Sequence, residues 1–215
     1  MRPHWHVTWL VLYPLAWLLL PLRVTGRDKL GRGARILAVN HTTNVDPILV
    51  GLAAHQELHF LAKQELFNAS RWFTWLIRSW NAWPVRRSGG DPQAMRKCSW
   101  LLQHRQKVVL FPEGTRSKTG ELTPFRAGIG LLSVTNRVPV IPTLISGTSR
   151  SMVSYVADRD FVKRGYRKKP TRPVTIRVTF GDPVRPDDFT NDRAGQLALT
   201  AEVESRMRRM AAENA

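Results

Sequence analysis

The sequence predicts an α/β domain in which helices cover a central, mostly parallel sheet, with an apolar, membrane-associated helical segment at the N-terminus. From residue 34 onward, short apolar runs typical of buried strands alternate with amphipathic stretches typical of helices. Two of these stretches begin at Asp46-Pro47 and Asp91-Pro92, and proline suits the first turn of a helix. Such alternation is typical of βαβ units, whose strands run parallel. At 215 residues, the chain is long enough to bury the core of one such domain.

The individual elements follow from their apolar patterns and their capping residues. Strands are expected at 35–39, 58–62, 107–111, 138–145 and 174–180, with a short extended piece at 83–86. Helices are expected to begin at Asp46, Ser70 and Asp91 and to occupy 127–134. A last helix is expected to carry its apolar face on Leu199, Val203, Met207 and Met210.

The N-terminal residues 5–22 are the most apolar stretch and carry no formal charge. As a helix they would reach about 27 Å, slightly less than a hydrocarbon core of about 30 Å, and Pro14 and Pro21 would kink and end that helix. The segment is therefore either a marginal single span or an element half-embedded in one leaflet. A signal peptide and burial against the domain's own core are the alternatives. We expect residues 1–30 to form a membrane-anchoring segment and residues 31–215 the folded domain.

The charge balance predicts an anionic partner. The chain has 33 Lys and Arg against 16 Asp and Glu, a net charge of +17, which suits nucleic acid, an anionic membrane or an anionic substrate. Basic residues between Arg23 and Arg35 follow the apolar segment, which predicts that the domain lies on the cytoplasmic side of the inner membrane. Residues 158–172 hold seven basic and two acidic residues and are expected to form a solvated loop or a docking surface. We expect no nucleic-acid partner, because the basic residues do not interleave with aromatic ones and no binding-module pattern appears.

The first motif that carries chemistry is Asn-His-Thr-Thr-Asn-Val-Asp, residues 40–46. His41 lies where a predicted strand ends, and active sites of α/β sheets gather at such strand ends. Asp46 follows five residues later, so the turn between them can bring its carboxylate to the imidazole. A carboxylate that accepts the Nδ1 proton leaves Nε2 free as a general base. Taken alone, this spacing is a weak signal and favours a satisfied structural histidine.

The second motif is Phe-Pro-Glu-Gly-Thr-Arg-Ser, residues 111–117, directly after the strongest predicted strand. Gly114 permits a tight turn, and Arg116 can hold a phosphate through two parallel hydrogen bonds. Thr115 and exposed backbone N–H groups would complete an anion-binding loop. Glu113 would bind a hydroxyl group or offset the local positive charge. An ordinary turn is the alternative interpretation.

Together the two motifs resemble the first and third sequence blocks of the 1-acyl-glycerol-3-phosphate acyltransferase group of glycerolipid acyltransferases. Residues 85–87, Val-Arg-Arg, are similar to the second block, and residues 138–142 are similar to the fourth. The order and spacing of the blocks match over residues 30 to 150. The resemblance implies the glycerolipid acyltransferase fold for residues 31–215.

The resemblance also implies a reaction. His41, held by Asp46, would deprotonate the free glycerol hydroxyl of lysophosphatidate. The oxygen would then attack the thioester of acyl-CoA or acyl carrier protein and give phosphatidate, with no acyl-enzyme. Glu113 and Arg116 would hold the glycerol phosphate, with Arg87 adding positive charge. Another lysophospholipid or an amino-acid-based lysolipid is the alternative acceptor.

Several further features complete the sequence-based expectations. Arg86 and Lys63 are additional candidates for substrate binding, and Arg126 stands where the family commonly has lysine. No cofactor is implied beyond the acyl thioester as co-substrate, and we expect no metal because no metal-ligand spacing appears. The helix after Ser70 carries an aromatic face at Trp72, Phe73, Leu76, Ile77 and Trp80. We expect this face to be core; a wall of the acyl-chain groove or a membrane-facing surface is the alternative.

Overall fold

The computed structural model describes residue 10, residues 21–85 and residues 91–214, and these residues contain one seven-stranded sheet. The strand order is β1-β7-β6-β2-β5-β3-β4, and every neighbouring pair is parallel except the antiparallel pair β6–β7. The predicted mostly parallel α/β sheet is therefore confirmed. The strands are β1 (Leu22–Thr25), β2 (Arg35–Val39), β3 (His59–Lys63), β4 (Ala82–Val85), β5 (Lys107–Leu110), β6 (Val140–Ser146) and β7 (Ile176–Phe180).

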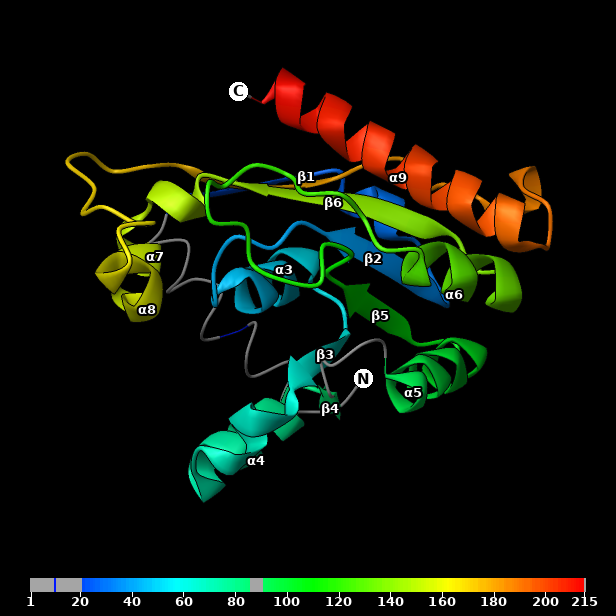
Figure 1. Cartoon of the computed structure of the whole chain (residues 1–215), viewed down its shortest axis with the longest axis horizontal. Coiled ribbons are helices and arrows are strands. Elements are labelled where there is room, and N and C mark those ends of the chain that lie inside the picture. Colours follow the sequence, from blue (N-terminus) through cyan, green and yellow to red (C-terminus); the bar gives the residue numbers. More distant parts are fainter. Residues whose placement is uncertain (1–9, 11–20, 86–90, 215) are drawn as a thin grey trace.

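Helices lie on both faces of this sheet, as Figure 1 shows. The α-helices are α3 (Asp46–Ala54), α4 (Arg71–Ser79), α5 (Pro92–Gln103), α6 (Gly128–Asn136), α7 (Met152–Ala157), α8 (Arg159–Lys163) and α9 (Arg193–Glu213). Short 3-10 helices are η2 (Arg27–Leu30), η3 (Gln64–Asn68), η4 (Thr148–Arg150) and η5 (Pro186–Asp188).

Strand β2 shows how the sequence builds two cores, one on each face. Ile36 and Ala38 pack in one buried cluster with apolar side chains of α5, α6 and α9, whereas Leu37 and Val39 pack in the other with side chains of α3. All four side chains are fully buried. Because successive strand residues point to opposite faces, a strand covered on both faces must be apolar at every position. This explains the uninterrupted apolar run from which β2 was predicted.

The folded domain includes residues that the sequence assigned to the N-terminal segment. Strand β1 pairs in parallel with β7 at the edge of the sheet, and Leu30 of η2 is fully buried. This four-residue strand was not predicted, because Leu22 was assigned to the apolar segment 5–22 and Arg23 to the basic run that follows it. The rest of the predicted anchoring segment lies almost entirely outside the described residues. Among the helices that the structure describes, none combines the length and the apolar character needed to cross a bilayer.

Two surface expectations need correction. In the basic segment 158–172, Asp158 is fully buried and Arg167 is 4% exposed, so these two residues are not part of a solvated loop. Lys168, Lys169 and Arg172 of the same segment are exposed, as expected. The aromatic face after Ser70 is also not core, because α4 has no buried residue. Both differences depend on tertiary partners, which local sequence patterns do not reveal.

Candidate active site

The two motif loops lie together at the carboxyl ends of the strands because they follow adjacent parallel strands. Residues 40–46 leave the carboxyl end of β2, and residues 111–117 leave that of β5. The loops are joined directly: Ser117 N–H donates to the His41 carbonyl over 2.7 Å. The His41 backbone N–H donates to Glu113 Oε1 over 2.8 Å. Clefts at the carboxyl ends of parallel strands are where α/β proteins place their ligands.

His41 and Asp46 form a buried pair. His41 Nδ1 lies 3.1 Å from Asp46 Oδ2, and the same oxygen accepts the backbone N–H groups of Thr42 (2.6 Å) and Thr43 (2.7 Å). Asp46 Oδ1 accepts the Thr43 hydroxyl over 2.8 Å, and the carboxylate is fully buried at the first residue of α3. A helix N-terminus favours negative charge. This arrangement favours the tautomer with the proton on Nδ1, which leaves Nε2 as a proton acceptor.

The His41 ring borders an apolar cavity of about 220 Å³. The ring stacks on Phe111, with centroids 4.2 Å apart and an angle of 29° between the planes. Leu61, Met95 and Ile129 contribute apolar walls, so the cavity presents hydrocarbon surface beside the imidazole. Asp91 and Arg126 also line it, and a mostly apolar pocket with a few polar groups suits the binding of an apolar chain next to the imidazole.

Glu113 holds the two motif loops together. Its side chain is buried; Oε1 accepts from His41 N, and Oε2 accepts from both the backbone N–H (3.0 Å) and the hydroxyl (2.7 Å) of Thr123. The sequence suggested that this carboxylate binds a hydroxyl group or offsets local positive charge, and the family resemblance implied that it helps to hold the glycerol phosphate. In the structure, protein donors occupy both of its oxygens, and their effect is to position His41.

Arg116 is held by two carboxylates. Its Nη1 donates to Asp158 Oδ1 (2.8 Å) and its Nη2 donates to Asp160 Oδ2 (2.7 Å). The guanidinium also lies 4.1 Å from the centroid of the Phe161 ring. The hydrogen bond from Arg116 lowers the pKa of Asp160 below its ordinary value. Both terminal nitrogens of Arg116, which was predicted to bind a phosphate, therefore contact protein carboxylates.

Asp158 and Arg167 clamp the motif loops from outside the predicted motifs. Asp158 Oδ1 accepts the backbone N–H of Asn44 over 2.9 Å in addition to Arg116. Arg167 Nη2 donates to the carbonyls of Thr42 (2.6 Å) and Ser117 (3.1 Å). Burial lowers the pKa of Arg167, as expected for a charge removed from water. In the sequence, the only signal for these residues was a basic segment, which pointed to solvent instead.

Gly114 and Arg126 lie at the edge of the cavity. Gly114 has φ +73°, a left-handed backbone conformation that favours glycine, and the end of the Arg126 side chain packs against its Cα. Within the described residues, no carboxylate lies at ion-pair distance from Arg126. From the sequence, Arg126 was identified only as an arginine at a position where the family commonly has lysine. Its position shortly after residues 111–117 could have indicated that it belongs to the site.

The remaining predicted site residues are less central. Thr115 is exposed on the motif loop. Lys63 ends β3 and pairs with Glu65 at 3.3 Å, and it does not line the cavity beside His41. Arg86 and Arg87 lie outside the described residues. In the described part of the chain, no group of three or more His, Cys, Asp or Glu side chains is arranged to hold a metal ion.

Comparisons with known proteins identify the family of this chain. A family model described as Acyltransferase matches residues 21–146. The chain is 28% identical over 180 residues to a 1-acyl-sn-glycerol-3-phosphate acyltransferase of Limnanthes douglasii, covering 81% of this chain and 58% of that protein. It is 26% identical over 157 residues to the enzyme of that name from Bacillus subtilis (strain 168), covering 73% of this chain and 69% of that protein. The chain thus spans less than two thirds of the plant relative.

A solved structure shares the fold. The crystal structure of the 1-acyl-sn-glycerophosphate (LPA) acyltransferase PlsC from Thermotoga maritima superposes with a TM-score of 0.69. The match covers 92% of this chain and 73% of that chain, at 24% sequence identity. At that level of identity the match establishes the shared fold, including the sheet that carries both motif loops.

Proposed function

This chain belongs to the acyltransferase family, and from that premise we propose that it transfers a fatty acyl group from an acyl thioester to the free glycerol hydroxyl of lysophosphatidate, giving phosphatidate. The names of the two relatives support this choice of acceptor. The observation that carries the proposal is the His41–Asp46 pair beside an apolar cavity, because it places a proton acceptor next to a space for an acyl chain.

The proposed chemistry needs one proton acceptor and no enzyme nucleophile. His41 Nε2 takes the proton of the glycerol hydroxyl while the oxygen attacks the thioester carbonyl carbon. The new C–O bond forms, the C–S bond breaks, and the leaving thiolate takes the proton back from the imidazolium. Asp46 stabilises the imidazolium through Nδ1–H, and its three other donors keep the carboxylate in place.

The acceptor's phosphate is proposed to bind at Arg126. This exposed guanidinium lines the same cavity as His41 and has no carboxylate partner among the described residues. Arg116 remains a predicted phosphate ligand, but a phosphate would have to displace Asp160, whose side chain is 47% exposed. The carboxylate of Asp158 is buried and would remain in place.

The donor and the location of the enzyme are also proposed from charge. Acyl-CoA and acyl carrier protein are both anionic, and exposed Lys168, Lys169 and Arg172 border a hollow of about 440 Å³ together with Arg150. These residues support an anionic donor of either kind. We propose that the protein works at the cytoplasmic face of the inner membrane, where its lipid acceptor resides and where its basic surface suits anionic lipid.

Acyl transfer from a labelled donor to a panel of lysolipids tests the proposal. His41→Ala is expected to lower kcat by about 10²–10⁴-fold, the range for loss of a general base. The matched control is His104→Ala, which removes an exposed histidine at the end of α5. Unchanged turnover in the folded His41→Ala protein would remove the base assignment. A panel in which another lysolipid is preferred would overturn the proposed acceptor.

A further inference from the structure

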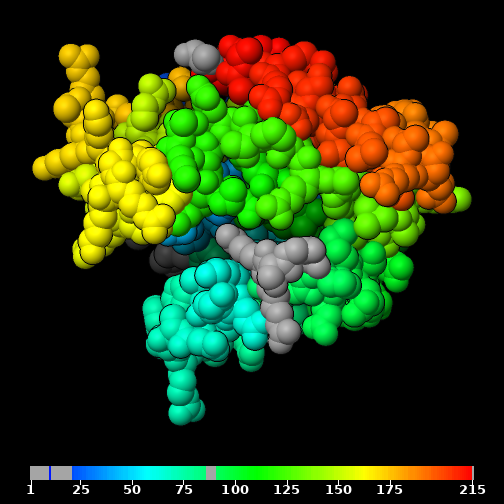
Figure 2. Space-filling model, in the orientation of Figure 1, coloured from blue at the N-terminus to red at the C-terminus, as the bar shows by residue number. Residues whose placement is uncertain are grey.

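Helices η3 and α4 present apolar side chains to solvent. We call residues 64–79 the η3–α4 surface; no residue of either helix is buried. Trp72 is 68% exposed, Trp75 is 65% exposed and Leu66 is 42% exposed. Figure 2 shows this part of the chain, in cyan to teal, projecting from the body of the molecule. Trp72 and Trp75 are three residues apart on α4 and therefore lie on the same side of the helix, and exposed apolar surface of this kind is typical of interaction sites.

The η3–α4 surface is a well-formed structural unit. Ser70 caps α4 by accepting the Phe73 N–H over 3.1 Å, and the Thr74 hydroxyl donates to the Phe67 carbonyl of η3 over 2.6 Å. It lies beyond β3 and β4 at one end of the sheet, on the opposite side of the molecule from α9 (Figure 1). Helix α4 has nine residues, a length of about 14 Å, so it is suited to lie along an interface and too short to cross a bilayer.

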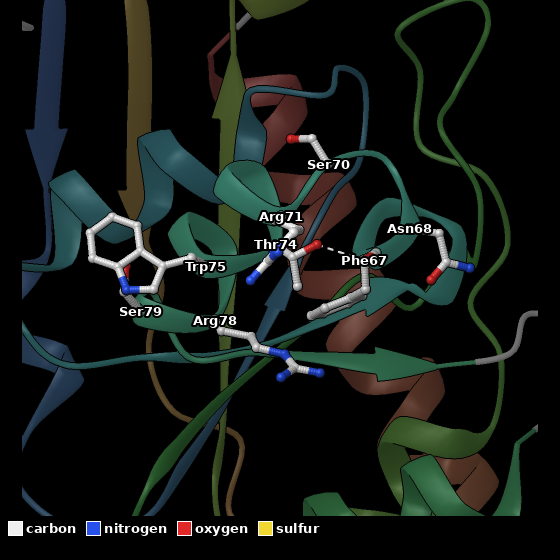
Figure 3. Close-up of a pocket in the computed structure, with 8 residues that line it drawn as sticks. All are labelled: Phe67, Asn68, Ser70, Arg71, Thr74, Trp75, Arg78 and Ser79. Carbon is white, nitrogen blue, oxygen red and sulfur yellow. Dashed lines mark hydrogen bonds between the residues drawn. The ribbon is translucent and has the colours of Figure 1, made fainter.

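Two arginines flank the exposed tryptophans. Arg71 and Arg78 line a hollow of about 670 Å³ together with Phe67 and Trp75, shown in Figure 3. Within the described residues, neither arginine has a carboxylate at ion-pair distance. The single acidic residue of the surface, Glu65, pairs with Lys63. The surface therefore combines exposed indole rings with two positive charges that no carboxylate of the described residues neutralises.

We propose that the η3–α4 surface docks onto an anionic phospholipid interface. Tryptophan favours the boundary between head groups and acyl chains, where Trp72 and Trp75 would lie. The guanidinium groups of Arg71 and Arg78 would contact lipid phosphates, which they match with paired donors. Leu61, on the strand that leads into η3, lines the cavity beside His41. Docking through this surface thus brings the proposed acyl-chain cavity to the bilayer from which its substrate must come.

A site-specific fluorescent label tests the docking surface. Cys98 is the only cysteine and is fully buried, so Trp72→Cys and Trp75→Cys each introduce one accessible thiol in the full chain. Leu197→Cys, on a residue of α9 that is 49% exposed, is the matched control. An environment-sensitive fluorophore at 72 or 75 should shift to the blue with vesicles of phosphatidylcholine and phosphatidylglycerol, and the label at 197 should not. Because each label reports its own position, an anchor elsewhere in the chain cannot mimic this result.

The same labels distinguish the other possible occupants. If the protein sediments with the vesicles while the labels at 72 and 75 remain in water, the proposal is overturned. A shift that appears without lipid when the protein concentration rises would assign the surface to a second copy of the chain and also overturn it. Vesicles of phosphatidylcholine alone should produce a weaker shift, because the two arginines then lack anionic partners.

The charge contribution is tested by paired substitutions. Replacing both arginines with glutamine (Arg71→Gln, Arg78→Gln) should weaken partition onto anionic vesicles about thirtyfold, since each basic residue near the surface contributes about 1 kcal/mol. The control, Arg193→Gln with Arg209→Gln, removes the same charge from exposed positions of α9. If both double variants lost the same affinity for anionic vesicles, the effect would depend on net charge and not on this surface, and the proposal would be overturned.

Catalysis separates this inference from the proposed reaction. With a short-chain lysophosphatidate dissolved as monomers, the η3–α4 variants should retain the kcat/KM of the unmodified protein, because the substituted residues are not in the catalytic site. With the acceptor embedded in anionic vesicles, the same variants should lose turnover. Absence of turnover on the soluble acceptor by the unmodified protein would contradict the proposed function, whereas the label shifts would still decide the docking surface.

Discussion

Arg167 is expected to be a major determinant of stability, although it lies in a segment whose composition suggests a solvated loop. Its guanidinium donates to the carbonyls of Thr42, Ser117 and Lys118, and the residue is 4% exposed. Each hydrogen bond from a charged donor contributes about 1.5–3 kcal/mol, and Arg167→Met would leave these acceptors without that donor. Relief of the buried charge offsets part of this loss. We therefore expect destabilisation of about 3 kcal/mol, a fall in Tm of about 6–12 °C for a chain of this size.

Thermal unfolding followed by circular dichroism measures the effect. The control is Arg164→Met, which removes an exposed arginine three residues away and should change stability by at most about 0.5 kcal/mol. Arg167→Met should also lower kcat more than it changes KM for either substrate, because the loop that holds His41 loses a support. Equal Tm values for the two variants would show that Arg167 does not stabilise the motif loops and would support the interpretation of residues 158–172 as a solvated loop.

Three further predictions test the phosphate site, the core packing and the single thiol. Arg126→Gln should lower kcat/KM for the acceptor about ten- to a hundredfold, and a change confined to the KM of the donor would contradict the phosphate site at Arg126. Arg116→Gln should lower the free energy of unfolding more than Arg126→Gln does, because the Asp158 carboxylate that Arg116 contacts is buried. Gly130→Ala should cost about 1–3 kcal/mol in urea unfolding, since its Cβ would overlap the Gln196 carbonyl of α9, and an unchanged midpoint would disprove that contact. Burial raises the pKa of Cys98 from 9.0 to about 12, so iodoacetamide should label this thiol only after unfolding, and rapid labelling of the native protein would contradict its burial. The free energy of unfolding should fall as the pH rises from 9.0 towards 12, because in that range only the thiol of the unfolded chain ionises.

Local patterns were sufficient to place the central strands and to predict the contact between His41 and Asp46. Strands β2 and β5 are apolar at nearly every position because helices cover both faces of the sheet, and the same pattern predicts parallel pairing. Two motifs that directly follow adjacent parallel strands must both lie at the carboxyl ends of those strands. His41 and Asp46 are five residues apart across a helix start, so their contact depends on local backbone geometry, which a short sequence encodes.

The partners of the other site residues were decided only by the tertiary structure. Glu113 and Arg116 were expected to meet substrate, yet protein donors and carboxylates engage them in the fold. Asp158 lies 114 residues from its partner Asn44, and no periodicity or spacing links residues so distant in the chain.

The sequence by itself determined the fold class and the positions of the two motifs, because periodicity, capping and short-range turns are local properties of the chain. The family followed from the resemblance of those motifs to known sequence blocks. Only the tertiary structure decided which charges are buried and which apolar residues remain exposed. The aromatic residues of α4 show the reason: an amphipathic pattern specifies that a helix has an apolar face, but not what that face contacts. For Trp72 and Trp75 the fold supplies no partner within the described residues that buries them, and that exposure is what makes a lipid interface the proposed partner.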